Sequence, residues 1–244
     1  LPILFLVLFP YFQAVLGWSA LRSAAAMLPM TLVMMPTSTL APRLAQRIGS
    51  RNTMLAGVAI FAVGLATLAL RASVDGGYWS VLPGLVVIGL GMGFTMTPST
   101  QAITETLPAD KQGVASALND TARELGGAVG IALLGSVLTA GYQSSIGPAL
   151  EGIPAELAEP ASEGIGAAFG VAAQDGAQGP AIIDAAQHAF VDGWVNSMWL
   201  GVGLAAVALV YLILRGPSRI GAGAVLPPAH ADHMDHVELA DLGA

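Results

Sequence analysis

Charged side chains are scarce in this sequence: they make up 10% of its 244 residues, whereas 55% are hydrophobic. A soluble domain typically carries about 25% charged residues, and the mean hydropathy of this chain is +0.70. The sequence has no cysteine, which excludes disulfides and thiolate metal sites. It also has no basic patch with interleaved aromatic residues, which argues against nucleic-acid binding. These shortages indicate an integral membrane protein surrounded largely by lipid.

The hydrophobic residues gather into long segments separated by turn-forming residues, and we expect an all-α membrane protein with six transmembrane helices. The predicted segments are 1–17, 24–41, 53–70, 79–98, 118–141 and 194–214. Crossing about 30 Å of hydrocarbon takes about 20 residues, so we expect the first segment to be the end of a truncated helix in a fragment. Prolines and glycines inside the segments are compatible with membrane helices, because neighbouring helices satisfy the freed backbone groups.

The basic residues predict the orientation of the chain. If the segments alternate in direction, only two basic residues, Arg22 and Arg71, fall on one side of the membrane. The other basic residues fall on the opposite side, and they are Arg43, Arg47, Arg51, Lys111, Arg123, Arg215 and Arg219. The positive-inside rule assigns this more basic side, and hence the C-terminus, to the cytoplasm. The segment 142–192 contains acids but no Lys or Arg, and we expect it to be an extracytoplasmic loop with short helices near 154–169 and 180–191. We expect 1–219 to form one bundle and 220–244 to be a disordered cytoplasmic tail.

A short connection between the second and third segments combines arginines with a glycine turn, at Arg43, Arg47, Gly49 and Arg51. Guanidinium groups at this place can fix the topology, or can pair with helix C-terminal carbonyls or with acids of a neighbouring helix. The stretch resembles the loop signature of the major facilitator superfamily, Gly-x-Leu-Ala-Asp-Arg-x-Gly-Arg-Arg, in the copy found in the second half of those transporters. Leu44, Ala45, Arg47, Gly49 and Arg51 match this signature, whereas Pro42, Gln46 and Ser50 depart from it.

Two further stretches are similar to the drug:proton antiporters with fourteen spans. Tyr11-Phe12-Gln13 and Gly17-Trp18-Ser19 resemble the first span of the second half in that family, and Asn119, Arg123 and Leu125-Gly126-Gly127 resemble its penultimate span. The resemblance implies the C-terminal six-helix half of a multi-pass transporter in the plasma membrane, the inner membrane in bacteria. It further implies export of hydrophobic or cationic compounds by proton antiport and alternating access, with the missing N-terminal half of the same polypeptide as partner and with no cofactor.

Polar residues at the start of the fifth segment are candidates for a conformational gate, and they are Asn119, Arg123 and Glu124. Asp120 and Glu124 are four residues apart and share a helix face, and ionisable residues in a span are functional candidates. The alternative is that they lie at the headgroup boundary, where an acid near a helix N-terminus is a favourable cap. The arginine connection at Arg43, Arg47, Gly49 and Arg51 is the second candidate for the gate.

Candidate cavity residues come from the first two segments, namely Gln13, Met27, Met30 and Met34. A methionine stripe on a helix bent by proline can line an adaptable cavity, although it can equally well be simple packing. The Gly-x-Gly-x-Gly run at Gly89, Gly91 and Gly93, and the pair Gly126 and Gly130, predict faces for close helix approach.

None of the predicted spans contains an Asp or Glu at depth. A proton antiporter needs a carboxylate with a raised pKa in a dehydrated cavity, so we expect the coupling acids in the missing half. An intramembrane enzyme would need a nucleophile–base pair or metal ligands within the spans, and we therefore expect no enzyme and no metal site. A non-transporting six-span binding or scaffold protein is the alternative that remains.

Overall fold

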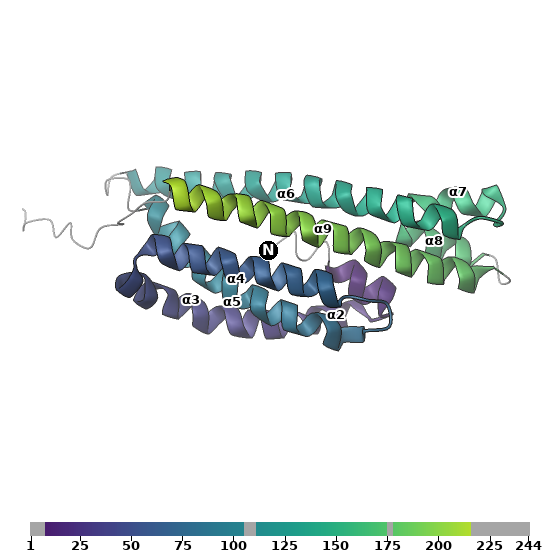
Figure 1. Ribbon diagram of the computed structural model, residues 1–244, viewed down its shortest axis with the longest axis horizontal. Helices are drawn as coiled ribbons and strands as arrows, with labels where there is room; N and C mark the ends of the chain where they lie inside the picture. The colour runs from purple at the N-terminus through teal and green to yellow at the C-terminus, as the bar shows by residue number, and fades with distance from the viewer. Residues whose placement is uncertain (1–7, 105–110, 175–177, 216–244) are drawn as a thin grey trace, which may run out of the picture.

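A computed structural model describes residues 8–104, 111–174 and 178–215, which are helical throughout except for short connections, and these residues contain no strand (Figure 1). The elements are a short π-helix η1 (Tyr11–Val15), α2 (Ala20–Ala26), α3 (Leu28–Ile48), α4 (Ser50–Arg71), α5 (Gly77–Thr104), α6 (Gln112–Ala149), α7 (Ala155–Glu163), α8 (Ile165–Ala172) and α9 (Gly179–Arg215). The predicted all-α membrane fold is confirmed.

Among the described residues, five helices are long and apolar enough to cross a membrane, and they cover Ala20–Ile48, Ser50–Arg71, Gly77–Thr100, Gly113–Ala149 and Gly179–Arg215. They correspond to the second to sixth predicted segments. Of the first predicted segment, the structure describes residues from Leu8 onward, including η1. The predicted tail 220–244 lies outside the described residues.

The helices α6 and α9 extend well beyond the apolar segments that predicted them. They have 38 and 37 residues, so each is about 56 Å long at about 1.5 Å per residue. Hydropathy marks only the apolar part of each helix, whereas packing against α7 and α8 supports the rest. One such contact is the hydroxyl of Tyr142, which donates to the carbonyl of Ala161 at 2.8 Å. Much of 142–192 is therefore helix: the end of α6, the short helices α7 and α8, and the start of α9.

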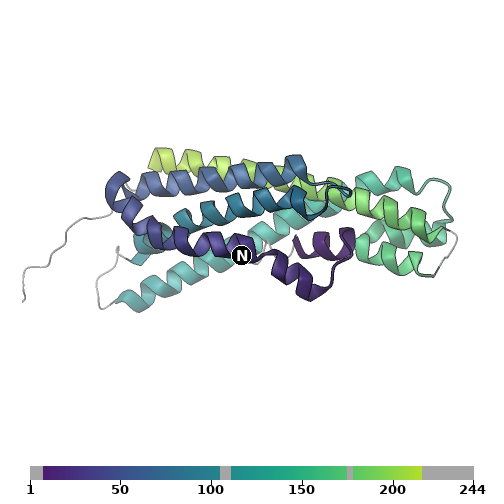
Figure 2. The same cartoon turned by 90° about the horizontal axis from the view of Figure 1, so that it is seen from below.

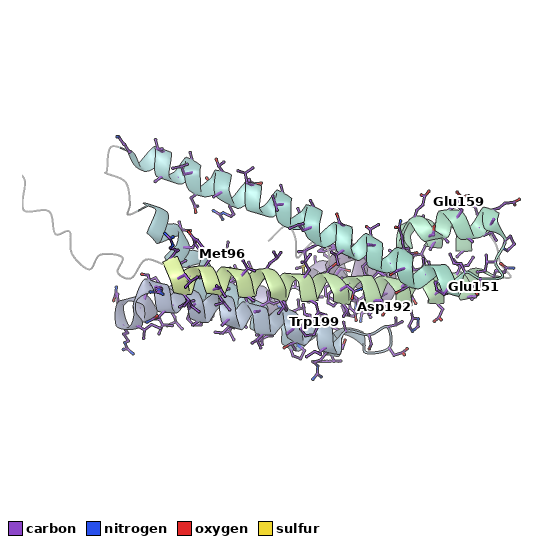
Figure 3. The ribbon with its side chains drawn as sticks, turned by 45° about the horizontal axis from the view of Figure 1, so that its top comes forward. Met96, Glu151, Glu159, Asp192 and Trp199 are labelled. Carbon is purple, nitrogen blue, oxygen red and sulfur yellow. The ribbon has the colours of Figure 1, made fainter. Side chains whose placement is uncertain are left out.

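The two ends of the bundle differ in charge. One end holds the α3–α4 connection, the start of α6 and the end of α9, and we call it the arginine end (Figure 1). The opposite end holds the end of α6, α7, α8 and the start of α9, and we call it the acidic end. Figure 3 places Glu151 and Glu159 at the acidic end. The predicted separation of basic and acidic residues is thus present in space.

Close helix contacts hold α5 between α3 and α4. A Cβ atom on Gly89 would lie 2.4 Å from the carbonyl oxygen of Met30 in α3, and one on Gly91 would lie 2.4 Å from the backbone nitrogen of Phe61 in α4. A Cβ on Gly93 would meet the side chain of Thr37 in α3. Only glycine fits at these positions without movement of a neighbour, so the prediction of small-residue faces on this helix is confirmed.

The helices α6 and α9 cross near the acidic end and then diverge. At the crossing, a Cβ on Gly193 would lie 2.4 Å from the carbonyl oxygen of Leu138, and the hydroxyl of Ser197 donates to the carbonyl of Leu134 at 2.8 Å. Toward the arginine end α6 moves away from α9 (Figures 2 and 3). A Cβ on Gly126 would find no atom within 4 Å. The close approach predicted at Gly126 was therefore wrong for this structure.

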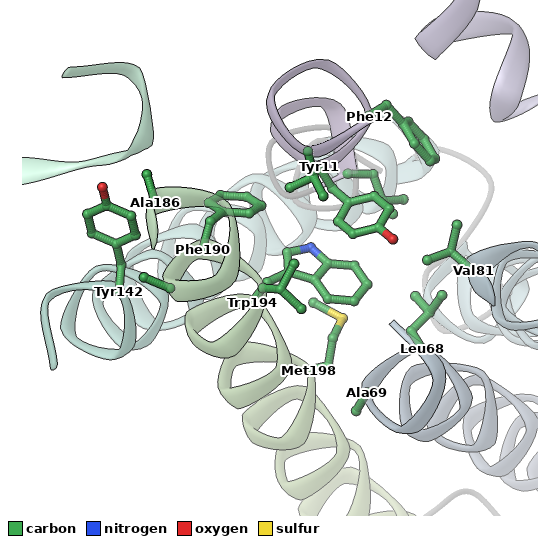
Figure 4. Close-up of a cluster of buried hydrophobic side chains, with 14 of the residues drawn as sticks. Tyr11, Phe12, Leu68, Ala69, Val81, Tyr142, Ala186, Phe190, Trp194 and Met198 are labelled. Atoms are coloured by element: carbon green, nitrogen blue, oxygen red, sulfur yellow. The ribbon is translucent and has the colours of Figure 1, made fainter. Parts of the chain in front are cut away.

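An aromatic core joins two helix groups, which are α3, α4 and α5 on one side and α6 and α9 on the other (Figure 4). The ring of Tyr11, from η1, stacks on Trp194 of α9 with 5.3 Å between ring centroids, and both side chains are fully buried. The Tyr11 hydroxyl donates to the carbonyl of Ser73, and Gln187 of α9 donates to the carbonyl of Ala14. The described part of the first predicted segment is thus packed into the centre of the bundle.

Candidate functional site

The arginine connection between α3 and α4 is shaped by a glycine. Gly49 has φ +89°, in the left-handed region that favours glycine, and its N–H donates to the carbonyl of Ala45 at 2.8 Å. This turn places Arg47 in the last turn of α3 and Arg51 in the first turn of α4. The resemblance had pointed to Gly49, and its backbone conformation gives the physical reason why a glycine is needed there.

Arg51 connects the start of α4 to the end of α9. Its Nε donates to the carbonyl of Leu212 at 3.0 Å, and its guanidinium also bonds to the carbonyl of Ile213. The last four carbonyls of a helix lack intrahelical donors, and a cation there is favourable. The interpretation that this connection pairs with helix carbonyls is therefore confirmed for Arg51. Arg43 and Arg47 are exposed and form no ion pair with any other described residue.

The second candidate gate lies near the start of α6. Arg123 pairs with Asp120 at 3.3 Å, with both side chains more than half exposed, and such a pair contributes little to stability. Asn119 is half-buried and Glu124 is exposed. Within the described ranges, no hydrogen bond or ion pair joins this group to Arg43, Arg47 or Arg51. A gating role for either group stays a prediction.

The four predicted cavity residues lie in different surroundings. Met27 and Met30 are buried in the hydrophobic core, Met34 is half-buried beside them, and Gln13 is exposed on η1. The backbone at Met30 and Met34 meets the glycine face of α5, so these methionines belong to the face of α3 that packs on α5. Their contact with a substrate stays a prediction.

An apolar groove of about 410 Å³ opens between the two helix groups. One wall comes from α4 and α5 and includes Phe61, Leu65 and Met92; the other comes from α6 and α9 and includes Gly126 and Met198. Among the described residues that line it, none is charged, and the only side-chain hydroxyl is that of Ser197, which already donates to Leu134. A volume of this size lies within the range of small-molecule sites. The groove therefore suits a hydrophobic ligand.

Sequence reasoning missed the residues of this groove, including Met92 and Met198. A signal for it existed in the small residues Gly126 and Gly130, which were assigned to helix packing. They line the open part of the wedge between α6 and α9. Spacing alone cannot distinguish a small residue that admits a neighbouring helix from one that leaves space empty.

The described residues form a helical, multi-pass membrane protein with an uncharged, apolar groove between its helices. The family model of the Major Facilitator Superfamily matches residues 1–131, and the chain belongs to this superfamily. The family prediction is confirmed, whereas the fourteen-span branch stays a prediction.

Several relatives carry names connected with drug resistance. The chain is 34% identical over 214 residues to the multidrug efflux pump LfrA of Mycolicibacterium smegmatis, covering 86% of this chain and 40% of LfrA. It is 32% identical over 190 residues to the methyl viologen resistance protein SmvA of Salmonella typhimurium, covering 77% of this chain and 37% of SmvA. It is 32% identical over 142 residues to the multidrug resistance protein B homolog of Mycobacterium tuberculosis, covering 58% of this chain and 26% of that protein. The chain thus spans 40% or less of the length of these three relatives.

Proposed function

We propose that this chain forms the C-terminal half of a multidrug exporter and supplies one wall of its substrate pathway. The observation that carries the proposal is the uncharged groove between α4, α5, α6 and α9, in a chain whose relatives are named as efflux and resistance proteins. An apolar site without fixed hydrogen-bonding groups binds ligands by their hydrophobic area, so it accepts compounds of varied structure. The expected substrates are hydrophobic compounds, including lipophilic cations.

The proposal includes proton antiport, with the proton-binding carboxylates in the N-terminal half of the same polypeptide. Within the described spans the acids lie near helix ends or on exposed positions: Asp120 and Glu124 in α6, and Asp184 and Asp192 in α9. None of them lines the groove. Since no acid of the described residues lies in the groove, we assign proton binding to carboxylates of the N-terminal half.

The location that we propose is the plasma membrane, the inner membrane in bacteria, with the arginine end and the C-terminus in the cytoplasm. The support is the concentration of arginines at one end of the bundle, together with the positive-inside rule. The helices α6 and α9 are about 56 Å long, so they project beyond the hydrocarbon layer, which is about 30 Å thick. With the arginine end in the cytoplasm, the projecting acidic end, with α7 and α8, would lie on the opposite side of the membrane.

A matched pair of substitutions on α9 tests the role of the groove. Ala205 is buried and lines it, whereas the neighbouring Ala206 is exposed and does not. In cells that carry the full-length polypeptide, Ala205→Phe should fill the groove and raise the accumulation of ethidium and the sensitivity to methyl viologen roughly tenfold. Ala206→Phe should leave both unchanged.

The same cells distinguish the alternatives. Collapse of the proton gradient should raise ethidium accumulation to the level of cells without the protein, and unchanged accumulation would remove the antiport proposal. If cells with and without the protein accumulate ethidium and methyl viologen equally, a non-transporting binding or scaffold protein becomes the better interpretation. Equal export by Ala205→Phe and the unsubstituted protein, at equal membrane levels, would show that the groove is not on the substrate pathway.

A further inference from the structure

A second, basic groove lies at the arginine end, between α3 and α5. It has a volume of about 370 Å³ and is lined by Leu40, Arg43, Leu44, Arg47 and Phe94. Phe94 comes two residues after Met92, which lines the apolar groove. Residues two apart on a helix point about 200° away from each other, so the two grooves open on opposite faces of α5. The basic groove is therefore separate from the proposed substrate site.

The positive charge of this groove is not neutralised by the described part of the chain. Arg43 and Arg47 are one helical turn apart and share a face, both are exposed, and neither forms an ion pair within 8–104, 111–174 and 178–215. Arg51 differs, because the carbonyls at the end of α9 already hold its guanidinium. Two adjacent guanidinium groups with exposed donors suit a phosphate, since each can form paired hydrogen bonds to its oxygens.

An apolar strip on the same helix leads up to these two arginines. Leu32, Pro36 and Leu40 precede them at spacings that keep all five residues on one face of α3. Leu32 is 65% exposed and Leu40 is 46% exposed. This face is apolar along the span and basic at its end, which is also the order of the acyl chain and the charged headgroup in a phospholipid.

We propose that this groove binds an anionic phospholipid of the leaflet at the arginine end. The lipid phosphate contacts Arg43 and Arg47, and its glycerol and upper acyl chain lie on Leu40, Leu44 and Phe94. Basic pockets between transmembrane helices on the cytoplasmic side are suited to anionic headgroups, and that leaflet carries the negative surface potential. The bound lipid holds α3 and α5 together at the membrane surface. This goes beyond the proposed export function, and it rests on the cytoplasmic location of the arginine end that was proposed with it.

The test is a lipid titration of the purified full-length polypeptide, stripped of lipid in detergent and observed by native mass spectrometry. Phosphatidylglycerol should bind at least tenfold more tightly than phosphatidylcholine. Arg43→Gln and Arg47→Gln should each weaken phosphatidylglycerol binding about fivefold, because one arginine near an anionic surface contributes about that factor. Arg71→Gln is the matched control, because Arg71 is exposed at the other end of α4, and it should bind the lipid like the unsubstituted chain.

Three outcomes would overturn the proposal. The first is that phosphatidylglycerol and phosphatidylcholine bind equally tightly, or that the Arg43→Gln/Arg47→Gln double variant, with unchanged circular dichroism, binds phosphatidylglycerol as tightly as the unsubstituted protein. The second is displacement of phosphatidylglycerol by millimolar glycerol phosphate together with unchanged binding in Phe94→Ala, which would indicate a site for a free anion. The third is weaker phosphatidylglycerol binding in Arg71→Gln than in Arg43→Gln or Arg47→Gln, which would mean that the lipid does not bind at this groove. Weaker binding in Phe94→Ala would support contact with the acyl chain.

Discussion

The helix group α3–α4–α5 and the part of α6 that precedes its crossing with α9 use glycine in opposite ways. In the first group Gly89 and Gly91 touch the backbone of neighbouring helices, so that α5 packs against both α3 and α4. In α6, a Cβ atom on Gly126, Gly127 or Gly135 would find no atom within 4 Å. Glycine therefore allows close contact between helices in one region, whereas in the other region no neighbouring atom lies opposite it.

The contacts of α6 explain this difference. Its close approach to α9 is at Gly141 and Gly193, near the acidic end, where a Cβ on Gly141 would lie 2.6 Å from the Cα of Gly193. From there to the arginine end α6 diverges, and apolar side chains such as Leu125 and Val129 are more than half exposed. The apolar groove lies where α6 has moved away, and residues of α4, α5, α6 and α9 line it.

The largest effect is expected from the same substitution made in both regions. Gly91→Ala places a methyl group 2.4 Å from the backbone nitrogen of Phe61 and 2.8 Å from the carbonyl oxygen of Gly57, neither of which can move without the helix. Overpacking of this kind destabilises by roughly 1–3 kcal/mol. Gly126→Ala meets open space and should change the stability by less than about 0.5 kcal/mol. Unfolding of the two purified variants in a detergent mixture, followed by circular dichroism, measures both values.

A second test of this comparison is Gly93→Ala, where the methyl group would lie 2.7 Å from the Cβ of Thr37 and 3.0 Å from the carbonyl oxygen of Met34. Rotation of a side chain moves neither atom, so its effect should be close to that of Gly91→Ala. If Gly126→Ala destabilised the chain as much as Gly91→Ala, α6 would be packed as closely as α5, and its divergence from α9 would be contradicted.

A smaller effect is expected where the two regions are joined at the arginine end. Arg51→Gln removes the guanidinium that α4 provides to the carbonyls of Leu212 and Ile213 in α9. A cation at a helix C-terminus contributes about 1 kcal/mol when partly buried, and the stability should fall by about that amount. Arg71→Gln, at an exposed arginine in the last turn of α4, is the comparison and should lower the stability by a smaller amount, about 0.3 kcal/mol, because its charge is fully accessible to water. Equal stability of the two variants would mean that Arg51 does not hold α9.

The sequence predicts the helices of this fold better than the space between them. Scarce charge and long apolar segments are sufficient for an all-α membrane protein, and the arginines of the α3–α4 connection identify the family signature. Helix ends were harder, because α6 and α9 continue into polar sequence where tertiary contacts such as Tyr142 to Ala161 support them. The groove could not be predicted, because Gly91 and Gly126 both lie in apolar helical sequence, and what lies opposite each of them is set by the tertiary structure.

The smallest effect is expected at the one hydroxyl in the groove wall. Ser197 of α9 donates to the carbonyl of Leu134 in α6, and interhelical hydrogen bonds of this kind contribute about 0.6 kcal/mol in membrane proteins. Ser197→Ala should therefore destabilise the chain by about that amount. The matched control is Ser136→Ala, since the Ser136 hydroxyl donates to Ala132 within α6 itself and its loss leaves the contact between helices intact. If the two variants unfolded at the same denaturant concentration, α6 would be held to α9 by the contact between Gly141 and Gly193 rather than by this hydrogen bond.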